Sequence, residues 1–195
     1  GNSLITGESV NEVLAERLPL TLTLGGLALL VLFCVSLFFA IISAIYKDKF
    51  IDKALNFISM GFLATPAFAL CLLLILFFSV YLGVLPSSGV SDLGFEDDFL
   101  KRAAHLVLPI LALTLAHLGS YLRLYRTILL DSLNQSFIEA AFARGLSLRR
   151  IYFHLVLKHA LPPILTYFTA NSVAFLMNVY VVESVFAYGG LGQLV

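Results

Sequence analysis

The sequence predicts an all-α, polytopic transmembrane helix bundle, and two observations predict it. Of the 195 residues, 60% are hydrophobic and only 12% are charged, which gives a mean hydropathy of +0.98. A soluble domain carries about 25% charged residues, so this chain has too few of them to cover a globular surface. The second observation is that four long stretches are almost free of charge. Each can form a helix that spans the roughly 20 residues needed to cross the hydrocarbon core.

The four stretches define the expected elements in chain order. We expect spans at about residues 18–46, 54–82, 103–122 and 160–182. Pro19 lies in the first turn of the first span, where its missing N–H does no harm. Pro66 lies inside the second span and Pro109 inside the third, where neighbouring helices or water can satisfy the freed carbonyls. Pro162 and Pro163 open the fourth span.

Lysine and arginine residues concentrate in two of the connections. Three follow the first span and six follow the third, so 3 + 6 = 9 of the twelve lie there: Lys47, Lys49, Lys53, Arg123, Arg126, Arg144, Arg149, Arg150 and Lys158. Cytoplasmic loops carry the excess of basic residues. We therefore expect both connections in the cytoplasm, and the N-terminal segment and residues 83–102 on the outside. Two basic connections on one side agree with four crossings.

The composition also excludes several function classes. Twelve Lys and Arg balance twelve Asp and Glu, so no net positive field indicates a nucleic-acid partner. Cys34 and Cys71 are too few for a disulfide scaffold, and we interpret them as small hydrophobic residues. The chain starts without Met, lacks the basic region of a secretory signal and stops after a Gly-rich turn, so we expect a piece of a longer protein.

The stretch from Ser136 to Pro163 carries the most specific pattern. It divides into two short helices, with Gly145 as a natural C-cap of the first and Ser147 as a natural N-cap of the second. Ala140 and Ala141 are small, so another backbone could approach closely. An amphipathic helix of this kind suits the groove of another subunit. It equally suits a position flat on the bilayer surface.

At these residues the chain resembles a known family. Glu139-Ala140-Ala141, followed by Gly145 and by Leu161-Pro162, resembles the EAA loop of binding-protein-dependent ABC importer permeases. The long spacing to Leu161-Pro162 resembles that of the dipeptide/oligopeptide/nickel branch. The segments at 183–192 and at 6–19 also resemble that branch. The resemblance covers essentially the whole chain.

The resemblance implies a function and a set of partners. Family members carry one further span before these four and another after them, so the chain would be the central part of a six-span permease with a cytoplasmic loop at about 123–159. The permease would lie in the bacterial cytoplasmic (inner) membrane and import a short peptide. It would pair with a second permease subunit, identical or different, with two cytoplasmic ATP-binding subunits and with an extracytoplasmic substrate-binding protein. The residues implied in ATPase coupling are Glu139, Ala140, Ala141, Gly145, Leu161 and Pro162.

Polar residues in the fourth span are candidates for a translocation path. Asn171 and Asn178 are seven residues apart and therefore share one helix face. Such groups either hold helices together or line a water-filled path. Glu183 lies near the outer end of the span, where a carboxylate can reach water, or it takes part in the following turn.

No metal, cofactor or catalytic site is expected. His154 and His159 are five residues apart and point to different faces of a helix, and His117 is a lone histidine in a span. The chain contains no phosphate-binding loop, nucleophile elbow or His-Glu-x-x-His motif. It is therefore predicted not to be an enzyme, and a separate subunit would hydrolyse ATP. The alternatives are a nickel or metal-chelate importer of the same branch, a passive channel or secondary carrier, and a membrane anchor without transport.

Overall fold

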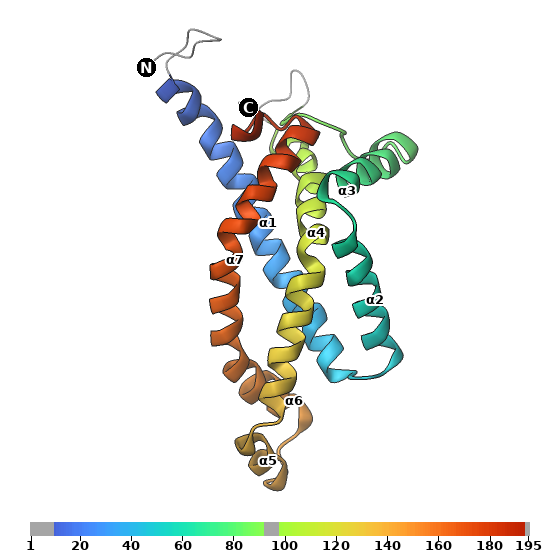
Figure 1. The fold of residues 1–195 in the computed structure, drawn as a ribbon, viewed down its shortest axis with the longest axis vertical. Coiled ribbons are helices and arrows are strands. Elements are labelled where there is room, and N and C mark those ends of the chain that lie inside the picture. The colour runs from blue at the N-terminus through green and yellow to red at the C-terminus, as the bar shows by residue number, and fades with distance from the viewer. Residues whose placement is uncertain (1–9, 92–97, 194–195) are drawn as a thin grey trace. The chain divides into compact units, whose positions relative to one another are not determined.

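The computed structural model describes residues 10–91 and 98–193, and within these ranges the chain forms helices and no strands. This confirms the all-α prediction (Figure 1). The elements in chain order are α1 (Val10–Ile45), α2 (Phe50–Ala64), α3 (Ala67–Leu74), the π-helix η1 (Ile75–Tyr81), α4 (Phe99–Leu133), α5 (Ser136–Ala143), α6 (Leu148–Arg150), the π-helix η2 (Ile151–Val156), α7 (Leu157–Phe186) and the 3₁₀-helix η3 (Leu191–Gln193).

Three helical stretches in the described ranges are long and apolar enough to cross a membrane. They are Asn11–Ile45, Phe99–Leu133 and Leu148–Phe186. A fourth results if α2 and the α3–η1 pair together make one span. The helix α4, which contains the third expected span at 103–122, begins before that span and ends well after it. Helical structure therefore continues beyond the apolar stretch into the basic connection, where the arginine and leucine residues are good helix formers.

The second expected span is not one continuous helix. The helix breaks inside the span expected at 54–82, because α2 ends at Ala64 and α3 begins only at Ala67. Pro66 has an extended backbone, with φ −57° and ψ 142°. Proline disfavours the helical region for the residue before it and cannot donate to the preceding turn. The helix therefore breaks at Pro66 and does not continue through the proline.

The fourth span begins earlier than the sequence predicts. The second short helix expected after Gly145 is not separate, since α6, η2 and α7 follow one another without a break. Pro162 and Pro163 lie inside α7 and do not open it. The Thr166 hydroxyl donates to the Pro162 carbonyl over 3.0 Å. The π-helical turns of η2 end just before the helix that contains these prolines, and such turns are a common adjustment in irregular helices.

The described residues form two compact units, and each unit takes residues from several helices. Unit 1 comprises the described residues within 1–32, 64–116 and 174–195, and unit 2 comprises 33–63 and 117–173. In unit 2, aromatic rings from three helices meet edge to face. Phe33 of α1 lies 5.0 Å from Phe168 of α7, and Tyr121 of α4 lies 5.4 Å from Tyr167, measured between ring centroids. Such contacts add to the apolar burial that holds α1, α4 and α7 together in this unit.

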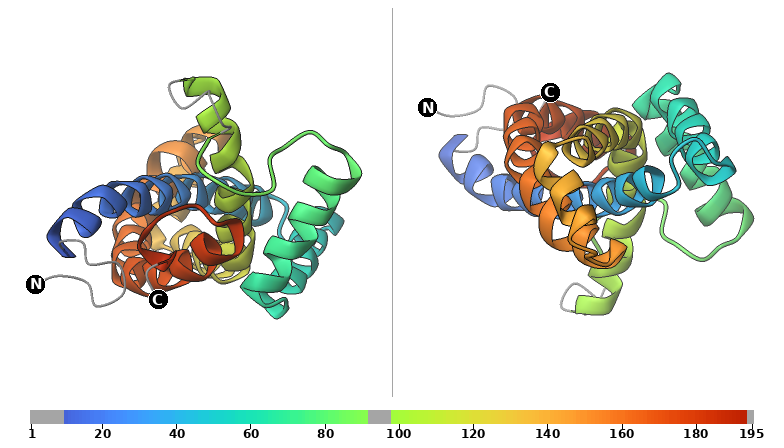
Figure 2. Two further views of the ribbon diagram at one scale, coloured as in Figure 1. Left: turned by 90° about the horizontal axis from the view of Figure 1, so that it is seen from above. Right: turned by 90° about the horizontal axis from the view of Figure 1, so that it is seen from below.

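Unit 1 is built on close contact between α1 and the C-terminal part of the chain. A Cβ at Gly25 would lie 3.0 Å from the Leu176 side chain, so the glycine lets α1 and α7 approach. The segment after α7 then returns beside α1 (Figures 1 and 2). There the Leu191 amide donates to the Thr21 hydroxyl over 2.9 Å. This contact positions the Gly-rich turn that follows α7.

Large apolar side chains cover much of the described surface. Residues more than three-quarters exposed include Phe50, Phe57, Tyr81, Phe99 and Leu100. Soluble monomers rarely expose contiguous apolar patches of this kind. The exposed surface is therefore suited to lipid, which agrees with the transmembrane prediction.

Candidate functional site

The helix α5 and the turn that ends it form the candidate site in unit 2. In Figure 1, α5 follows the end of α4 and lies next to α6. The first turn of α5 carries Glu139, and the helix ends at Ala143. The Leu146 amide donates to the Ala141 carbonyl over 3.2 Å, and the Gly145 amide donates to the Phe142 carbonyl over 2.9 Å. This pair of bonds is a Schellman motif, which satisfies the last carbonyls of a helix.

Gly145 has a φ of +73°, so the predicted left-handed conformation is confirmed. A Cβ built at Gly145 would meet no heavy atom within 4 Å. The requirement for glycine is therefore conformational and not steric. Ser147 then precedes α6 with an extended backbone at φ −66° and ψ 145°, without a side-chain capping bond. The Ile151 amide donates to the Ser147 carbonyl over 3.0 Å as the next helix starts.

The small residues of α5 do not all face outward. Ala141 is only 4% exposed and packs within its own chain, as Ile138 does, so its close approach to another subunit stays a prediction. Helical periodicity turns the neighbouring positions outward. Glu139 is exposed, Ala140 is half-buried and the Phe142 ring is 47% exposed. The face available to a partner is therefore the one that carries Glu139 and Phe142.

The exposed apolar surface continues past the turn. Leu148 is 63% exposed, whereas Ile151 is fully buried. Arg149 and Arg150 follow it and are also exposed. The candidate docking surface is defined here as the exposed side chains of Glu139, Phe142 and Leu148.

Leu161 and Pro162 lie within α7, apart from the turn at Gly145 in the chain. Leu161 is half-buried and Pro162 is exposed. The residue that ties α7 to the loop is His159, which sequence analysis considered only as a metal ligand. The Ser132 hydroxyl and the His159 Nδ1 atom are 3.1 Å apart, and the His159 ring lies 5.2 Å from the Phe137 ring. His159 thus joins the end of α4, the start of α5 and the start of α7.

A partly buried ion pair in unit 2 is the main feature that the sequence pattern does not indicate. The Asp52 side chain is 4% exposed, and its Oδ2 atom lies 2.6 Å from Nη2 of Arg126. The Nε atom of Arg126 donates to Oδ1 of the same carboxylate over 2.8 Å. The pair joins α2 to α4 across 74 positions in the sequence. The available signal was Asp52 itself, an acidic residue between two lysines of a basic connection.

Glu183 in unit 1 is fully buried, so the expectation that its carboxylate reaches water is wrong. Its Oε2 atom accepts a hydrogen bond from the Gly192 amide over 2.8 Å. A Cβ at Gly190 would collide with the carboxylate, and one at Gly192 would lie 2.7 Å from the Tyr180 carbonyl oxygen. The two glycines therefore let the turn close over Glu183, which agrees with the alternative reading of a residue that takes part in this turn.

The two asparagines of α7 donate to their own helix. The Nδ2 atom of Asn171 donates to the Tyr167 carbonyl over 2.9 Å, and that of Asn178 to the Ala174 carbonyl over 3.3 Å. Both side chains are half-buried. Bonds to the preceding turn satisfy the amide donors inside the membrane. The role of these residues in a translocation path stays a prediction.

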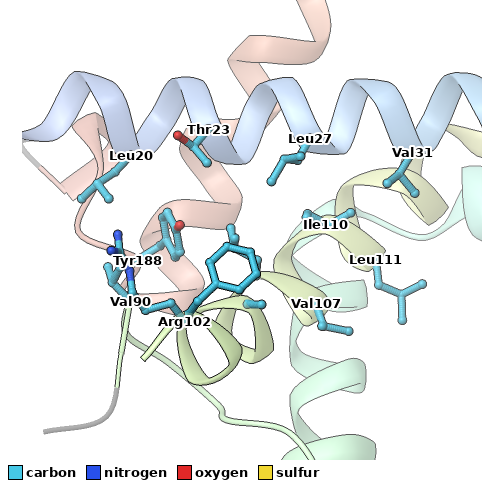
Figure 3. A pocket seen from close by; sticks show the side chains of 13 residues that line it. Leu20, Thr23, Leu27, Val31, Val90, Arg102, Val107, Ile110, Leu111 and Tyr188 are labelled. Carbon is cyan, nitrogen blue, oxygen red and sulfur yellow. The ribbon is translucent and has the colours of Figure 1, made fainter. Parts of the chain in front are cut away.

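Unit 1 contains a cavity of about 630 Å³ between the outer parts of α1 and α4. Leu20, Val90, Arg102 and Tyr188 lie at one end, and Val31 and Leu111 lie at the other (Figure 3). The predicted path residues Asn171, Asn178 and Glu183 are not among those that line it. The lining is apolar except near Arg102, so the cavity suits an apolar group better than a hydrated solute.

No group of three or more His, Cys, Asp or Glu side chains that could hold a metal ion occurs in residues 10–91 and 98–193. Cys71 is buried, and Cys34 is exposed on α1.

Comparison with known families shows to which family the chain belongs. Residues 36–195 match the family described as "Binding-protein-dependent transport system inner membrane component". The chain belongs to this family. It is therefore an inner membrane component, and the resemblance of the chain to this family is confirmed.

Curated relatives are permeases of the peptide/nickel branch. It is 36% identical to the oligopeptide transport system permease protein AppB of Bacillus subtilis, over 100% of this chain and 62% of AppB. It is 31% identical to the oligopeptide transport system permease protein OppB of Salmonella typhimurium, over 95% of this chain and 58% of OppB. The metal-staphylopine import system permease protein CntB of Staphylococcus aureus is 29% identical over 100% of this chain and 59% of CntB. The chain thus spans about three-fifths of the length of these relatives.

A solved structure shows the same fold. A chain of the inward-facing MetNI methionine ABC transporter matches 94% of this chain and 78% of its own length, with a TM-score of 0.69 and 21% identity. At this identity the likeness establishes the fold alone.

Proposed function

We propose that this chain forms the central membrane-spanning part of a permease subunit that imports short peptides with the energy of ATP. The observation that carries the proposal is the loop of α5, Gly145 and α6, which presents exposed apolar side chains between two candidate spans. Exposed side chains such as Phe142 and Leu148 on a connection between two spans suit burial against a partner or against the bilayer surface. Buried in a partner's groove, the same side chains would stabilise an interface.

The partners follow from the family and from the chemistry of the chain. The docking surface would bind one of two cytoplasmic ATP-binding subunits. A second permease subunit, identical or different, would complete the pathway. An extracytoplasmic binding protein would deliver the substrate. The chain is not an enzyme in this proposal, and ATP is hydrolysed by the ATP-binding subunits. Residues 1–195 correspond to a single transmembrane domain, with the loop at 134–147 as its coupling element.

The peptide substrate is supported by the names of AppB and OppB. The similarity to CntB supports a metal chelate as the second candidate. Calorimetric titration of the cognate binding protein with short peptides and with nickel chelates separates the two. Peptide binding alone supports the first candidate, and chelate binding alone replaces it with the second.

Co-purification tests the docking surface. The complex of this chain with its ATP-binding subunits is extracted in detergent, with Phe142→Ala compared with Phe57→Ala, a matched change at an exposed phenylalanine of α2. We expect Phe142→Ala to reduce the recovered ATP-binding subunits by roughly tenfold, the loss typical of a buried aromatic anchor at an interface. Phe57→Ala should leave recovery unchanged. Equal recovery with both variants contradicts the docking role.

A passive channel or secondary carrier is the rival from another class. Carriers use charged or unwound residues at membrane depth. The purified permease pair without its ATP-binding subunits, reconstituted in proteoliposomes, should take up no labelled peptide. Uptake in their absence would favour the rival.

A further inference from the structure

The Asp52 carboxylate is the centre of a larger polar network in unit 2. Besides the two bonds from Arg126, it accepts the Asp48 backbone amide at Oδ2 over 2.8 Å and the Asn56 side-chain amide at Oδ1 over 2.8 Å. The Ser43 hydroxyl also donates to Oδ1. The donors come from α1, from the α1–α2 turn, from α2 and from α4. One carboxylate thus joins three helices and a turn.

The network also holds the turn between α1 and α2 in its shape. Asp48 has a φ of +64°, a left-handed conformation that Asp tolerates better than most non-glycine residues. Its amide is held by Asp52 Oδ2. Any displacement of Asp52 therefore displaces the whole turn.

The network lies directly upstream of the candidate coupling loop. Seven residues, or about two helical turns, separate Arg126 from Leu133, the last residue of α4. Ser132 lies between them and contacts His159, whose ring packs on Phe137 of α5. The C-terminal part of α4 is therefore bound to α2 by Arg126 and to α7 by Ser132, and His159 of α7 packs on α5.

The ion pair contributes little net stability, because the cost of removing the Asp52 charge and part of the Arg126 charge from water offsets their attraction. The bidentate geometry instead fixes position and orientation, since both oxygens are held at once. Such an ion pair is therefore suited to helices that move together as a unit.

We propose that Asp52 and Arg126 are positioning residues that transmit movement of α5 through the end of α4 to α2. The inference rests on the proposed function, in which ATP-binding subunits displace α5. Without the pair, α5 would still dock and ATP would still be hydrolysed. The movement of α5 would then be transmitted only weakly to α2, and the peptide taken up per ATP would fall.

The experiment uses the whole complex with its binding protein in proteoliposomes, and a labelled pool of short peptides as the probe. Two variants, Asp52→Asn and Arg126→Lys, are compared with wild type and with Lys53→Gln, the matched change at the exposed neighbour of Asp52. Arg126→Lys keeps the charge opposite Asp52 but loses the fork that binds both oxygens. The measurements are the amount of complex assembled, the rate of ATP hydrolysis and the peptide taken up per ATP.

We expect peptide uptake per ATP to fall by roughly tenfold in both variants, the order of effect expected when a buried charge pair loses its geometry. Assembly and ATP hydrolysis should persist, and Lys53→Gln should match wild type. A proportional fall in hydrolysis and uptake, or loss of assembly in both variants, would show that the pair is only structural and overturn the inference. Fully coupled variants would also overturn it. Absence of ATP-dependent uptake in wild type would instead refute the proposed function, and this inference with it.

Discussion

Glycine residues in this chain serve two different physical needs. At Gly145 the need is conformational, because φ is +73° and the space around a Cβ is open. At Gly190 the need is steric, because a Cβ would collide with the buried Glu183 carboxylate. The two kinds of glycine respond differently to substitution, so each can be tested with its own pair of variants.

Gly145→Val should uncouple ATP hydrolysis from peptide uptake, and Gly145→Asn should retain most of the uptake. A β-branched residue in the left-handed region costs about 1–2 kcal/mol or more, whereas Asn tolerates this region better. The Val variant should tilt or extend α5 and misplace the docking surface while leaving its side chains intact. Peptide uptake and ATP hydrolysis of both variants in proteoliposomes check this. If Val and Asn behave alike, the backbone conformation at Gly145 is not what matters.

Gly190→Ala should destabilise unit 1. The added methyl must displace the Glu183 carboxylate, and overpacking of this kind costs about 1–3 kcal/mol. Gly26→Ala is the matched control, because Gly26 is exposed on α1 and its Cβ meets nothing within 4 Å. That control should be neutral or more stable by about 0.5–1 kcal/mol, since alanine favours the helix. Thermal unfolding in detergent measures both, and equal midpoints would contradict the steric role.

At the scale of the elements, close approach of backbones decides which helices pair in unit 2. A Cβ at Gly119 of α4 would lie 2.5 Å from the Ser59 carbonyl oxygen and 3.0 Å from the Leu63 Cβ atom, both on α2. Small residues that let backbones approach are the usual means of helix association in membranes. The Asp52–Arg126 pair links the same two helices. Packing and charge therefore act together on α2 and α4.

Gly119→Ala should weaken the packing of α2 on α4. The methyl would contact backbone atoms that cannot move independently of their helix. We therefore expect the free energy of unfolding to fall by about 1–3 kcal/mol. A cysteine pair placed on facing positions of α2 and α4 should then cross-link more slowly in the variant than in wild type. An unchanged cross-linking rate, together with an unchanged unfolding midpoint, would argue against close packing at Gly119.

At the scale of the whole molecule, charge distribution predicts the orientation in the membrane. Nine of the twelve basic residues fall in two connections. Through Asp52 and Arg126, the first connection is held against the helix that leads into the second. This contact is what a shared cytoplasmic side requires.

Cysteine labelling tests the orientation. Single cysteines at Ser88 and at Ser147, both exposed, are placed in a chain lacking Cys34 and Cys71. An impermeant thiol reagent added outside intact cells should label Ser88→Cys and leave Ser147→Cys unlabelled until the membrane is opened. Labelling of both positions from outside would overturn the predicted orientation.

Properties that depend on composition or on neighbouring residues could be predicted from the sequence. The transmembrane class follows from apolar area summed along the chain, and this sum does not depend on which helices meet. The left-handed turn at Gly145 follows from a few adjacent residues. The resemblance to the family likewise needs no contacts, and the family match confirms it.

Properties that depend on distant contacts were decided only by the tertiary structure. Asp52 and Arg126 are 74 positions apart, and nothing local marks them as partners. The burial of Glu183 needs the Gly-rich turn to fold back over it, and the burial of Ala141 needs α5 to pack on its own unit. Pro66 shows the same dependence, because a membrane helix absorbs a proline only where neighbouring groups satisfy its freed carbonyls. Pairing, burial and helix breaks arise from surroundings that a linear pattern does not contain.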